Sequence, residues 1–339
     1  MKSTFKFASA LAILLLSNIA TQAAPGYQTI ELAVAHRDHP LPLHIWYPGK
    51  DDGVVKSLGK NAVFTGVEVR PGAAPLDQKF PIVLLSHGSG GNAVNIGWIA
   101  AHLADQGMVV VSTNHPGTTS RDSLPRETLK IWQRPDDLTA ILDFFEKTPP
   151  LDLQVDMTRV GAVGFSLGGY TVLGLAGARV SKQKYIDYCV KTPELLDCLW
   201  YRATGVDLKS IDGEKFEQSN LDDRIKTSVA IDPGLAQAFI VESLEKVHSP
   251  VLIVNLGSQS MVPAGVEGDE IAAALKHSEY ARIEGATHFS FLGECTALGE
   301  IIIKEEGDEP ICSEVSDRKR SDIHNELKGL ISDYLKKQL

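Results

Sequence analysis

Ser166 lies at the centre of a Gly-x-Ser-x-Gly pattern, and no other residue of the chain has a setting so well suited to nucleophilic chemistry. A short apolar run at residues 159–163 precedes it, and another at 170–178 follows. This order predicts a buried strand, a sharp turn and a helix, the arrangement that holds a strained serine with its Oγ clear of the sheet. The turn also directs the N–H of Leu167 to where an oxyanion would form. A Gly-rich turn with an incidental serine is the alternative, but the flanking elements favour a catalytic serine.

His288 is the candidate base that such a serine needs, because a hydroxyl is a weak nucleophile without one. It follows residues 280–283, which we expect to be the last strand, and it lies in a loop of small residues. In this arrangement the chain order is serine, acid, histidine. Two other late histidines fit less well, since we expect His277 on a helix before that strand and His324 on the exposed face of the last helix.

The acid that orients this histidine is less clearly marked. It usually follows the strand expected here at residues 250–256, but no carboxylate comes directly after that strand. Asp232 ends the preceding expected strand, and its side chain can reach the imidazole because neighbouring strand ends meet at one edge of a sheet. We therefore favour Asp232, with Asp269 and Glu267 as the alternatives. Asp232 could instead serve only to cap a following helix.

A second oxyanion donor is expected from the loop after the apolar strand at residues 81–86. That loop reads His-Gly-Ser-Gly-Gly over residues 87–91, so its backbone can approach a substrate closely. The N–H of Ser89 is the candidate donor. We expect His87 to orient the loop rather than to act as a base, and His115, at another strand end, to line the pocket or to form a simple turn.

The elements that must position these residues form an α/β pattern. Apolar strands alternate with amphipathic helices, which predicts a mostly parallel sheet with helices on both faces. We expect an antiparallel hairpin at the start and an edge strand after it. The expected strands are residues 29–35, 41–47, 62–69, 81–86, 108–112, 159–163, 227–231, 250–256 and 280–283, and the expected helices are 95–106, one from 134 onward, 170–178 and 320–338.

Residues 179–226 interrupt this alternation. They are polar and lie between the helix after Ser166 and the next strand. We interpret them as an inserted cap or lid beside the site. The alternative is a surface excursion that does not touch the substrate.

The N-terminus has the features of a secretory signal peptide. Lys2 and Lys6 precede an apolar core at residues 7–16, and small residues then precede a cleavage point after Ala23. Cleavage after Ala24 is disfavoured because Pro25 would follow the scissile bond. Residues 24–339 would then form one mature domain, secreted or periplasmic. An uncleaved membrane anchor is the alternative, but no stop-transfer flank is present.

Four cysteines suit an exported chain, because an even number favours disulfides and four allow three pairings. We favour the local pairing, Cys189 with Cys198 and Cys295 with Cys312, since each closes a short loop. Free buried thiols are the alternative. No cysteine or histidine cluster has zinc-site spacing.

The net charge of −10 argues against nucleic-acid binding and against docking on anionic membranes. Signal cleavage would remove two lysines and make the chain more acidic. Apart from the N-terminus, no stretch is long and apolar enough for a transmembrane helix, so we expect no membrane insertion after cleavage. The chemistry outlined above requires no cofactor or metal, and the sequence does not indicate an oligomeric state.

The chain resembles the α/β-hydrolase superfamily, and within it the branch of platelet-activating-factor acetylhydrolases and bacterial "predicted dienelactone hydrolases". The resemblance extends from residue 41 to the C-terminal helix. Its marks are Ser86-His87-Gly88, Asn114-His115-Pro116-Gly117, Gly164-Phe165-Ser166-Leu167-Gly168-Gly169 and Ala230-Ile231-Asp232.

This resemblance implies an α/β-hydrolase fold and supports two assignments. In the acetylhydrolases the acid also follows the strand after the nucleophile, which favours Asp232, and the residue after the His-Gly pair donates the second oxyanion N–H, which favours Ser89. Dienelactone hydrolases use a cysteine nucleophile, so Ser166 sets this chain apart from their chemistry.

The sequence thus predicts an exported serine carboxylic-ester hydrolase for small or short-to-medium acyl esters. An amidase or peptidase with the same three residues is the first alternative. A binding protein built on the same fold is the second, and the presence of Ser166, Asp232 and His288 together argues against it.

Overall fold

The computed structural model describes residues 24–306 and 309–339, so the signal peptide predicted at residues 1–23 lies outside the described part. A ten-stranded mixed sheet forms the centre, in the order β12-β11-β10-β9-β5-β6-β2-β1-β4-β3. The five pairings from β12 through to β6 are all parallel, whereas β2 pairs antiparallel with both β6 and β1. The sheet is therefore mostly parallel with an antiparallel hairpin, as predicted.

The strands of this sheet agree closely with the apolar runs of the sequence. They are β1 (Gly26–Leu32), β2 (Leu41–Tyr47), β3 (Lys56–Leu58), β4 (Val67–Pro71), β5 (Phe80–Ser86), β6 (Val109–Thr113), β9 (Val155–Phe165), β10 (Ile225–Ile231), β11 (Val251–Leu256) and β12 (Ser278–Ile283), while β7 (Thr118–Thr119) and β8 (Asp122–Ser123) form a separate small hairpin. Every residue of β5, β6 and β11 is buried, because helices cover both faces of the sheet.

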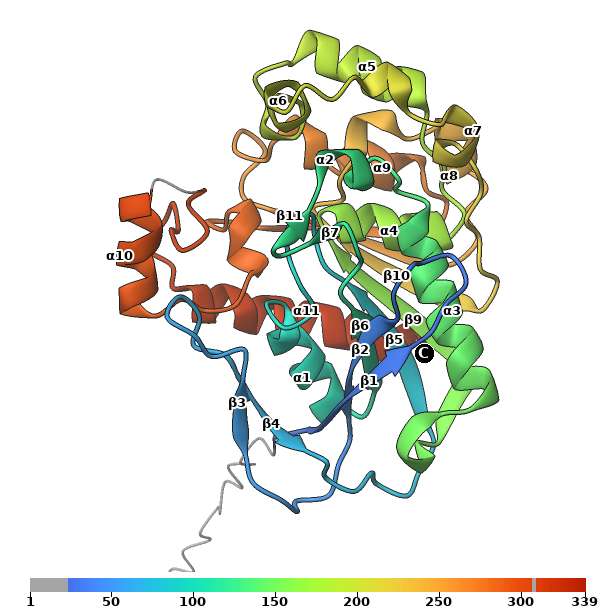
Figure 1. Cartoon of the computed structure of the whole chain (residues 1–339), viewed down its shortest axis with the longest axis vertical. Coiled ribbons are helices and arrows are strands. Elements are labelled where there is room, and N and C mark those ends of the chain that lie inside the picture. The colour runs from blue at the N-terminus through green and yellow to red at the C-terminus, as the bar shows by residue number, and fades with distance from the viewer. Residues whose placement is uncertain (1–23, 307–308) are drawn as a thin grey trace, which may run out of the picture.

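Helices pack on the two faces of the sheet (Figure 1). Two apolar cores lie between the helices and the sheet, one on each face. The longer helices are α1 (Gly97–Asp105), α3 (Gln133–Lys147), α4 (Leu167–Leu175), α5 (Lys182–Lys191), α6 (Leu196–Ala203), α10 (Ala297–Glu306) and α11 (Arg320–Gln338), and the short ones are α2 (Pro125–Thr128), α7 (Gly213–Phe216), α8 (Val241–Leu244) and α9 (Asp269–Ala274). One core joins α3 and α4 to the sheet, and the other joins α1 and α11. Successive β5 residues, such as Leu84 and Leu85, belong to opposite cores, as the alternation of a strand requires.

Several details differ from the sequence expectations, including the position of α4, which begins at Leu167 rather than at residue 170. The edge strand expected at residues 62–69 is instead the antiparallel pair of β3 and β4. His277 lies in the turn between α9 and β12 rather than on a helix. His324 is only 2% exposed, because the face of α11 that carries it packs on α1, where its ring stacks on Trp98 with centroids 3.9 Å apart.

Residues 179–226 contain α5, α6 and α7, which form the top of the molecule in Figure 1. They pack on segments that follow β10 and β11. The N–H of Ser181 donates to the Ala238 oxygen at 2.8 Å, and Lys184 Nζ donates to the Phe239 oxygen at 2.9 Å. Buried tyrosines of α5 and α6, including Tyr185 and Tyr201, give the segment an apolar interior.

Two disulfides join Cys189 to Cys198 and Cys295 to Cys312, the local pairing that the sequence favoured. The first links α5 to α6 within residues 179–226. The second ties the segment before α10 to the segment before α11. Both cross-links restrict loop-rich regions that have few strands to stabilise them.

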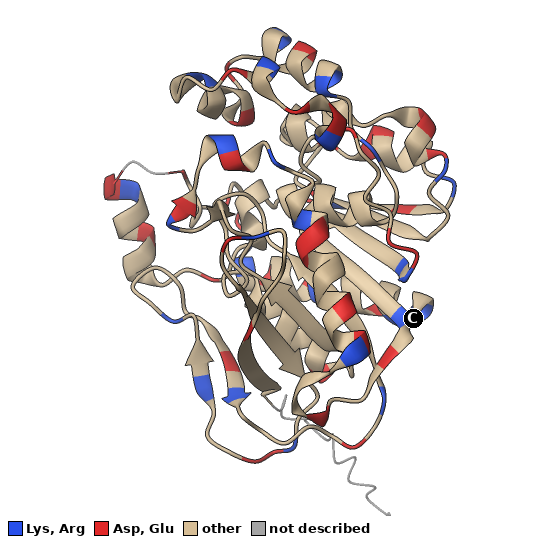
Figure 2. Cartoon of the chain, turned by 45° about the vertical axis from the view of Figure 1, so that its right-hand side comes forward, with Lys and Arg blue, Asp and Glu red and all other residues tan. Residues whose placement is uncertain are grey.

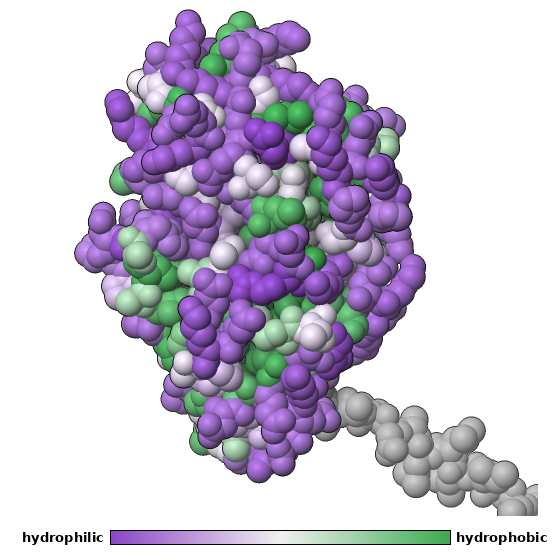
Figure 3. All heavy atoms as spheres, turned by 90° about the vertical axis from the view of Figure 1, so that its right-hand side faces the viewer, coloured by the Kyte–Doolittle hydropathy of each residue, from purple (hydrophilic) through white to green (hydrophobic). Residues whose placement is uncertain are grey.

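The surface is polar and carries charges of both signs. Figure 2 shows acidic and basic residues interspersed along the helices, while the strands carry few of them. The face in Figure 3 is mostly hydrophilic, with apolar residues in small separate groups. Within residues 24–306 and 309–339, no helix has the length and apolar character needed to cross a bilayer.

Candidate active site

Ser166 occupies the sharp turn between β9 and α4. Its φ of 56° and ψ of −121° are strained for a residue with a side chain, and the turn is fixed by a hydrogen bond from its N–H to the Ile231 oxygen at 2.9 Å. The flanking glycines are required by space. A Cβ at Gly164 would lie 2.0 Å from the Gly168 oxygen, and a Cβ at Gly168 would lie 2.0 Å from the Ser86 oxygen. The sequence pattern therefore corresponds to a packed turn with the serine at its apex.

His288 lies beside Ser166, with its Nε2 3.1 Å from the Ser166 Oγ. It begins a short 3₁₀ helix, His288–Phe291, whose start is fixed by reciprocal bonds between Thr287 and Ser290. Ser290 also donates to the Glu314 carboxylate, which pairs with Arg320. A largely buried ion pair thus supports the loop that carries the histidine.

Asp232 accepts a hydrogen bond from His288 Nδ1 at 2.8 Å through its Oδ2. Its Oδ1 accepts two more, from the Leu256 N–H at 2.9 Å and from Asn255 Nδ2 at 2.8 Å. The Asp232 side chain is fully buried, whereas that of His288 is 20% exposed. A carboxylate fixed on both oxygens can hold the imidazole in the tautomer that leaves Nε2 free to accept a proton.

The two alternative acids are engaged elsewhere. Glu267 pairs with Arg282 at 2.8 Å and accepts from the Tyr280 hydroxyl. Asp269 begins α9 and accepts the N–H of Glu270. Of the three carboxylates considered from the sequence, Asp232 is therefore the one in contact with His288.

Asn255 is a residue that sequence reasoning missed. Its Nδ2 donates to Asp232, and its Oδ1 accepts the N–H of Gly268 at 2.8 Å, so it joins the acid to the loop after β11. A signal was present, since an asparagine interrupts an otherwise apolar buried strand. Buried polar side chains require partners, and such an interruption indicates one.

The backbone around the proposed oxyanion donors is closely packed. A Cβ at Gly88 would lie 2.9 Å from the Ser166 Cβ, so the loop after β5 runs directly beside the serine. In the part of the chain that the structure describes, no protein acceptor takes a hydrogen bond from the N–H of Ser89 or of Leu167.

Aromatic side chains form the apolar surroundings of the imidazole. The Phe165 ring centroid lies 4.7 Å from that of His288, and the Phe289 centroid lies at 5.4 Å. Phe165 in turn stacks on Phe291. Apolar walls of this kind exclude water and strengthen electrostatic interactions at the site.

His115 belongs to a second hydrogen-bonded series of a serine, a histidine and an aspartate, which the sequence did not predict. Its Nε2 lies 3.0 Å from Ser86 Oγ, and its Nδ1 lies 2.8 Å from Asp137 Oδ2. All three side chains are fully buried, so this second series of residues cannot reach a substrate. Burial lowers the pKa of His115 to about 4, so the ring is neutral and accepts the Ser86 proton at Nε2.

His87 has the structural role that we expected. It is fully buried, its Nδ1 donates to the Gly88 oxygen at 2.6 Å, and its Nε2 accepts the His115 N–H at 3.2 Å. Burial holds its pKa well below the usual range. His87 therefore orients the glycine-rich loop and is not exposed to act as a base.

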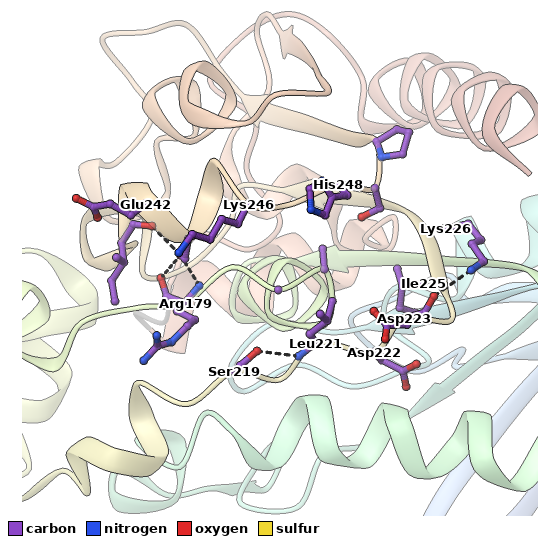
Figure 4. A pocket seen from close by; sticks show the side chains of 16 residues that line it. Arg179, Ser219, Leu221, Asp222, Asp223, Ile225, Lys226, Glu242, Lys246 and His248 are labelled. Carbon is purple, nitrogen blue, oxygen red and sulfur yellow. Dashed lines mark hydrogen bonds between the residues drawn. The ribbon is translucent and has the colours of Figure 1, made fainter.

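A cavity of about 620 Å³ lies at the amino ends of the parallel strands, opposite the ends that carry Ser166 and Asp232 (Figure 4). Residues at or just before the starts of β10 and β11, including Ile225, Lys226 and Pro250, line it. Ser166 lies at the end of β9, which runs parallel to β10, so the cavity is not part of the Ser166 site. Charged side chains of both signs surround it, and among residues 24–306 and 309–339 no acidic, histidine or cysteine cluster suited to a metal ion was found.

Comparisons with known proteins identify the fold. No protein-family model matches the chain, and no curated protein matches it by sequence. A ferulic acid esterase from Streptomyces cinnamoneus superposes with a TM-score of 0.64 at 17% identity, covering 94% of this chain and 91% of that one. A dienelactone hydrolase from Anabaena variabilis superposes with a TM-score of 0.52 at 15% identity, covering 93% and 99%. The chain has the α/β-hydrolase fold.

Proposed function

We propose that this α/β-hydrolase-fold chain is a serine hydrolase that cleaves carboxylic esters, with Ser166 as nucleophile, His288 as base and Asp232 as the acid that orients it. The observation that carries the proposal is the continuous contact from Ser166 Oγ to His288 Nε2 at 3.1 Å and from His288 Nδ1 to Asp232 at 2.8 Å. Two features support it. The backbone at Ser166 is strained, and the Asp232 side chain is buried whereas that of His288 is partly exposed to solvent.

In the proposed reaction His288 takes the Ser166 proton as Oγ attacks the ester carbonyl. The N–H groups of Leu167 and Ser89 stabilise the oxyanion, and His288 then protonates the leaving alcohol. Water, activated by the same histidine, hydrolyses the acyl-enzyme. Asp232 stabilises the imidazolium that forms in both steps, and the carboxylate itself stays ionised.

The proposed substrates are small or short-to-medium acyl esters. In support, the helices of residues 179–226 are short, and none is a long apolar lid of the kind that an interfacial lipase requires. We further propose that residues 179–226 cap the site. A Cβ added at Gly265 would lie 2.7 Å from Asp197 Oδ2 and 2.8 Å from the Tyr188 hydroxyl, so α5 and α6 pack closely against the loop after β11.

We also propose export, either to the periplasm or outside the cell. The signal-peptide features of the sequence and the two disulfides support this, because disulfides persist in oxidising compartments. N-terminal sequencing of the protein recovered from the medium or periplasm tests it. The expected result is a chain that begins at Ala24.

The decisive experiment measures hydrolysis of p-nitrophenyl esters of increasing acyl length by wild-type protein and Ser166→Ala. Turnover that is lost in the variant supports the esterase, and the optimal chain length gives the size of the acyl pocket. Matched amides test the alternative of an amidase. If no ester or amide is cleaved and a fluorophosphonate does not label Ser166, the proposed function is wrong.

A further inference from the structure

Arg134 is a fully buried cation behind the Ser166 site, with 1% of its surface exposed. It lies in the first turn of α3. Its guanidinium makes four hydrogen bonds, to Thr171 Oγ1 at 3.1 Å, Thr118 Oγ1 at 2.6 Å, Ser86 Oγ at 3.2 Å and the His87 main-chain oxygen. All four acceptors are neutral oxygens. Burial lowers its pKa to about 9, so the group remains charged at neutral pH.

One of these bonds reaches the loop that carries the first proposed oxyanion donor. The His87 oxygen that Arg134 binds belongs to the peptide that joins His87 to Gly88, next to Ser89. Gly88 lies against Ser166, where a Cβ would be 2.9 Å from the serine Cβ. A shift of this peptide would therefore move the Ser89 N–H relative to the nucleophile.

A second bond reaches the helix that carries the other donor. Thr171 Oγ1 accepts from Arg134 Nε, and the same hydroxyl donates to the Leu167 oxygen at 2.9 Å. Leu167 begins α4 directly after Ser166. Arg134 thus contacts both segments from which the proposed oxyanion N–H groups project.

The remaining bonds fix the guanidinium itself. Ser86 accepts from Arg134 and donates to the neutral His115, which in turn donates to Asp137. Both carboxylate oxygens of Asp137 are occupied by His36, Arg37 and His115. In the described part of the chain no carboxylate forms an ion pair with Arg134, so no counter-ion in direct contact neutralises its field.

We propose that Arg134 is a positioning residue for the oxyanion hole, which holds the Ser89 and Leu167 N–H groups at a fixed separation and places a positive charge behind them. This inference rests on the proposed function. An oxyanion carries full charge only in the transition state and the tetrahedral intermediate, so preorganised donors and a nearby cation lower the barrier more than they strengthen substrate binding. The loss of Arg134 should therefore lower kcat with little change in KM.

The test compares kcat and KM for p-nitrophenyl acetate in wild type, Arg134→Met, Arg134→Lys and Thr171→Val. Loss of a direct oxyanion donor typically costs about 10²–10³ in kcat, so for an indirect role we expect about tenfold in Arg134→Met at unchanged KM. Arg134→Lys, which keeps the charge, should recover part of this loss. Thr171→Val keeps the shape of the side chain and removes both bonds of its hydroxyl, the one from Arg134 Nε and the one to the Leu167 oxygen. It breaks the connection from Arg134 to Leu167 while keeping Arg134, so it gives an answer even if Arg134→Met does not fold.

Arg224→Gln is the matched control. Arg224 pairs with Asp222 and with Asp143 and Glu146 toward the far end of the same helix, α3. Within the described residues it forms no hydrogen bond or ion pair with Ser166 or with either donor segment. The Arg224→Gln substitution should lower the melting temperature and leave kcat unchanged. The rate of Ser166 labelling by a fluorophosphonate provides a second readout, since the attack also develops charge on oxygen.

The outcomes separate this inference from the proposed function. Ester turnover that depends on Ser166, together with wild-type kcat in Thr171→Val and in any Arg134→Met protein that folds, would overturn the role of Arg134 alone. So would losses of kcat that follow the melting temperature in every variant, Arg224→Gln included. A wild-type protein that neither cleaves esters nor is labelled would overturn the proposed function, and the role of Arg134 with it.

Discussion

Replacing Asp232 with asparagine tests the proposed catalytic residues most sharply, because the structure fixes how the new side chain must lie. Oδ1 of Asp232 accepts from the Leu256 N–H and from Asn255 Nδ2, so only the amide oxygen can occupy that position. The amide NH₂ must then face His288 Nδ1. A donor there forces the imidazole proton onto Nε2, and the ring can no longer accept the proton of Ser166.

The fold should survive this change. Asp232 has a φ of 43°, in the left-handed region that asparagine tolerates better than most residues. The expected loss in kcat is about 10⁴, equivalent to about 5.4 kcal/mol of transition-state stabilisation. The melting temperature should change much less than this figure would suggest, because shape and main-chain bonds are retained.

The assay is steady-state hydrolysis of p-nitrophenyl acetate at pH 7 to 9, with Asp269→Asn as the matched control. Asp269→Asn should keep wild-type kcat, since in the described part of the chain the Asp269 carboxylate accepts a hydrogen bond from the Glu270 N–H at its own helix start and none from His288. A folded Asp232→Asn protein that keeps a tenth or more of the wild-type kcat would refute the reasoning. A large loss in Asp269→Asn instead would assign the acid to α9.

Three further predictions concern stability. Gly168→Ala should prevent the turn at Ser166 from packing, because the new Cβ would lie 2.0 Å from a main-chain oxygen. Gly329→Ala in α11 meets open space and should stabilise the fold by roughly 1 kcal/mol. Thermal melts compare the two variants, and a stable Gly168→Ala protein would contradict the prediction for Gly168. Reduction of Cys295–Cys312, which are 17 positions apart, should cost about 3 kcal/mol. It should also lower activity, because Cys312 is two residues before Glu314, which accepts from Ser290 in the His288 segment; unchanged melting and activity in reductant would show otherwise. Burial lowers the pKa of His324 to about 3 and that of His115 to about 4, so between about pH 4 and pH 6.5 the folded state binds fewer protons than the unfolded state. The urea midpoint should therefore fall from pH 7 to pH 5, and a constant midpoint would disprove this.

Much of the fold could be predicted because strong local patterns agreed with the tertiary arrangement. The residues of β2 and α11 were predicted to the same boundaries that the structure has. Apolar runs bounded by glycine and proline have few ways to be buried, so they locate a parallel sheet well. The edge of the sheet formed by the N-terminal strands β3 and β4 was predicted less well. Both strands are short and partly exposed, and their pairing depends on which segments of the fold lie beside them.

The candidate site was predictable where chemistry and turn geometry coincide. Ser166 requires glycines on both sides, and His288 requires a loop after a strand, so both leave a local signal. The choice of Asp232 over Asp269 rested on which strand ends are neighbours and on the resemblance to a family. Its contact with His288 spans 56 positions of the chain and is a property of the sheet order.

By itself, the sequence determined the strand, turn and helix around Ser166 and the alternation that produces a core on each face of the sheet, and it favoured the local pairing of the cysteines. Only the tertiary structure decided which carboxylate meets His288, that His324 is buried, and that Arg134 lies between the two donor segments. The physical reason is the range of the interactions. Turn geometry and hydrophobic periodicity depend on adjacent residues, whereas buried polar networks form between side chains that only the folded sheet brings together.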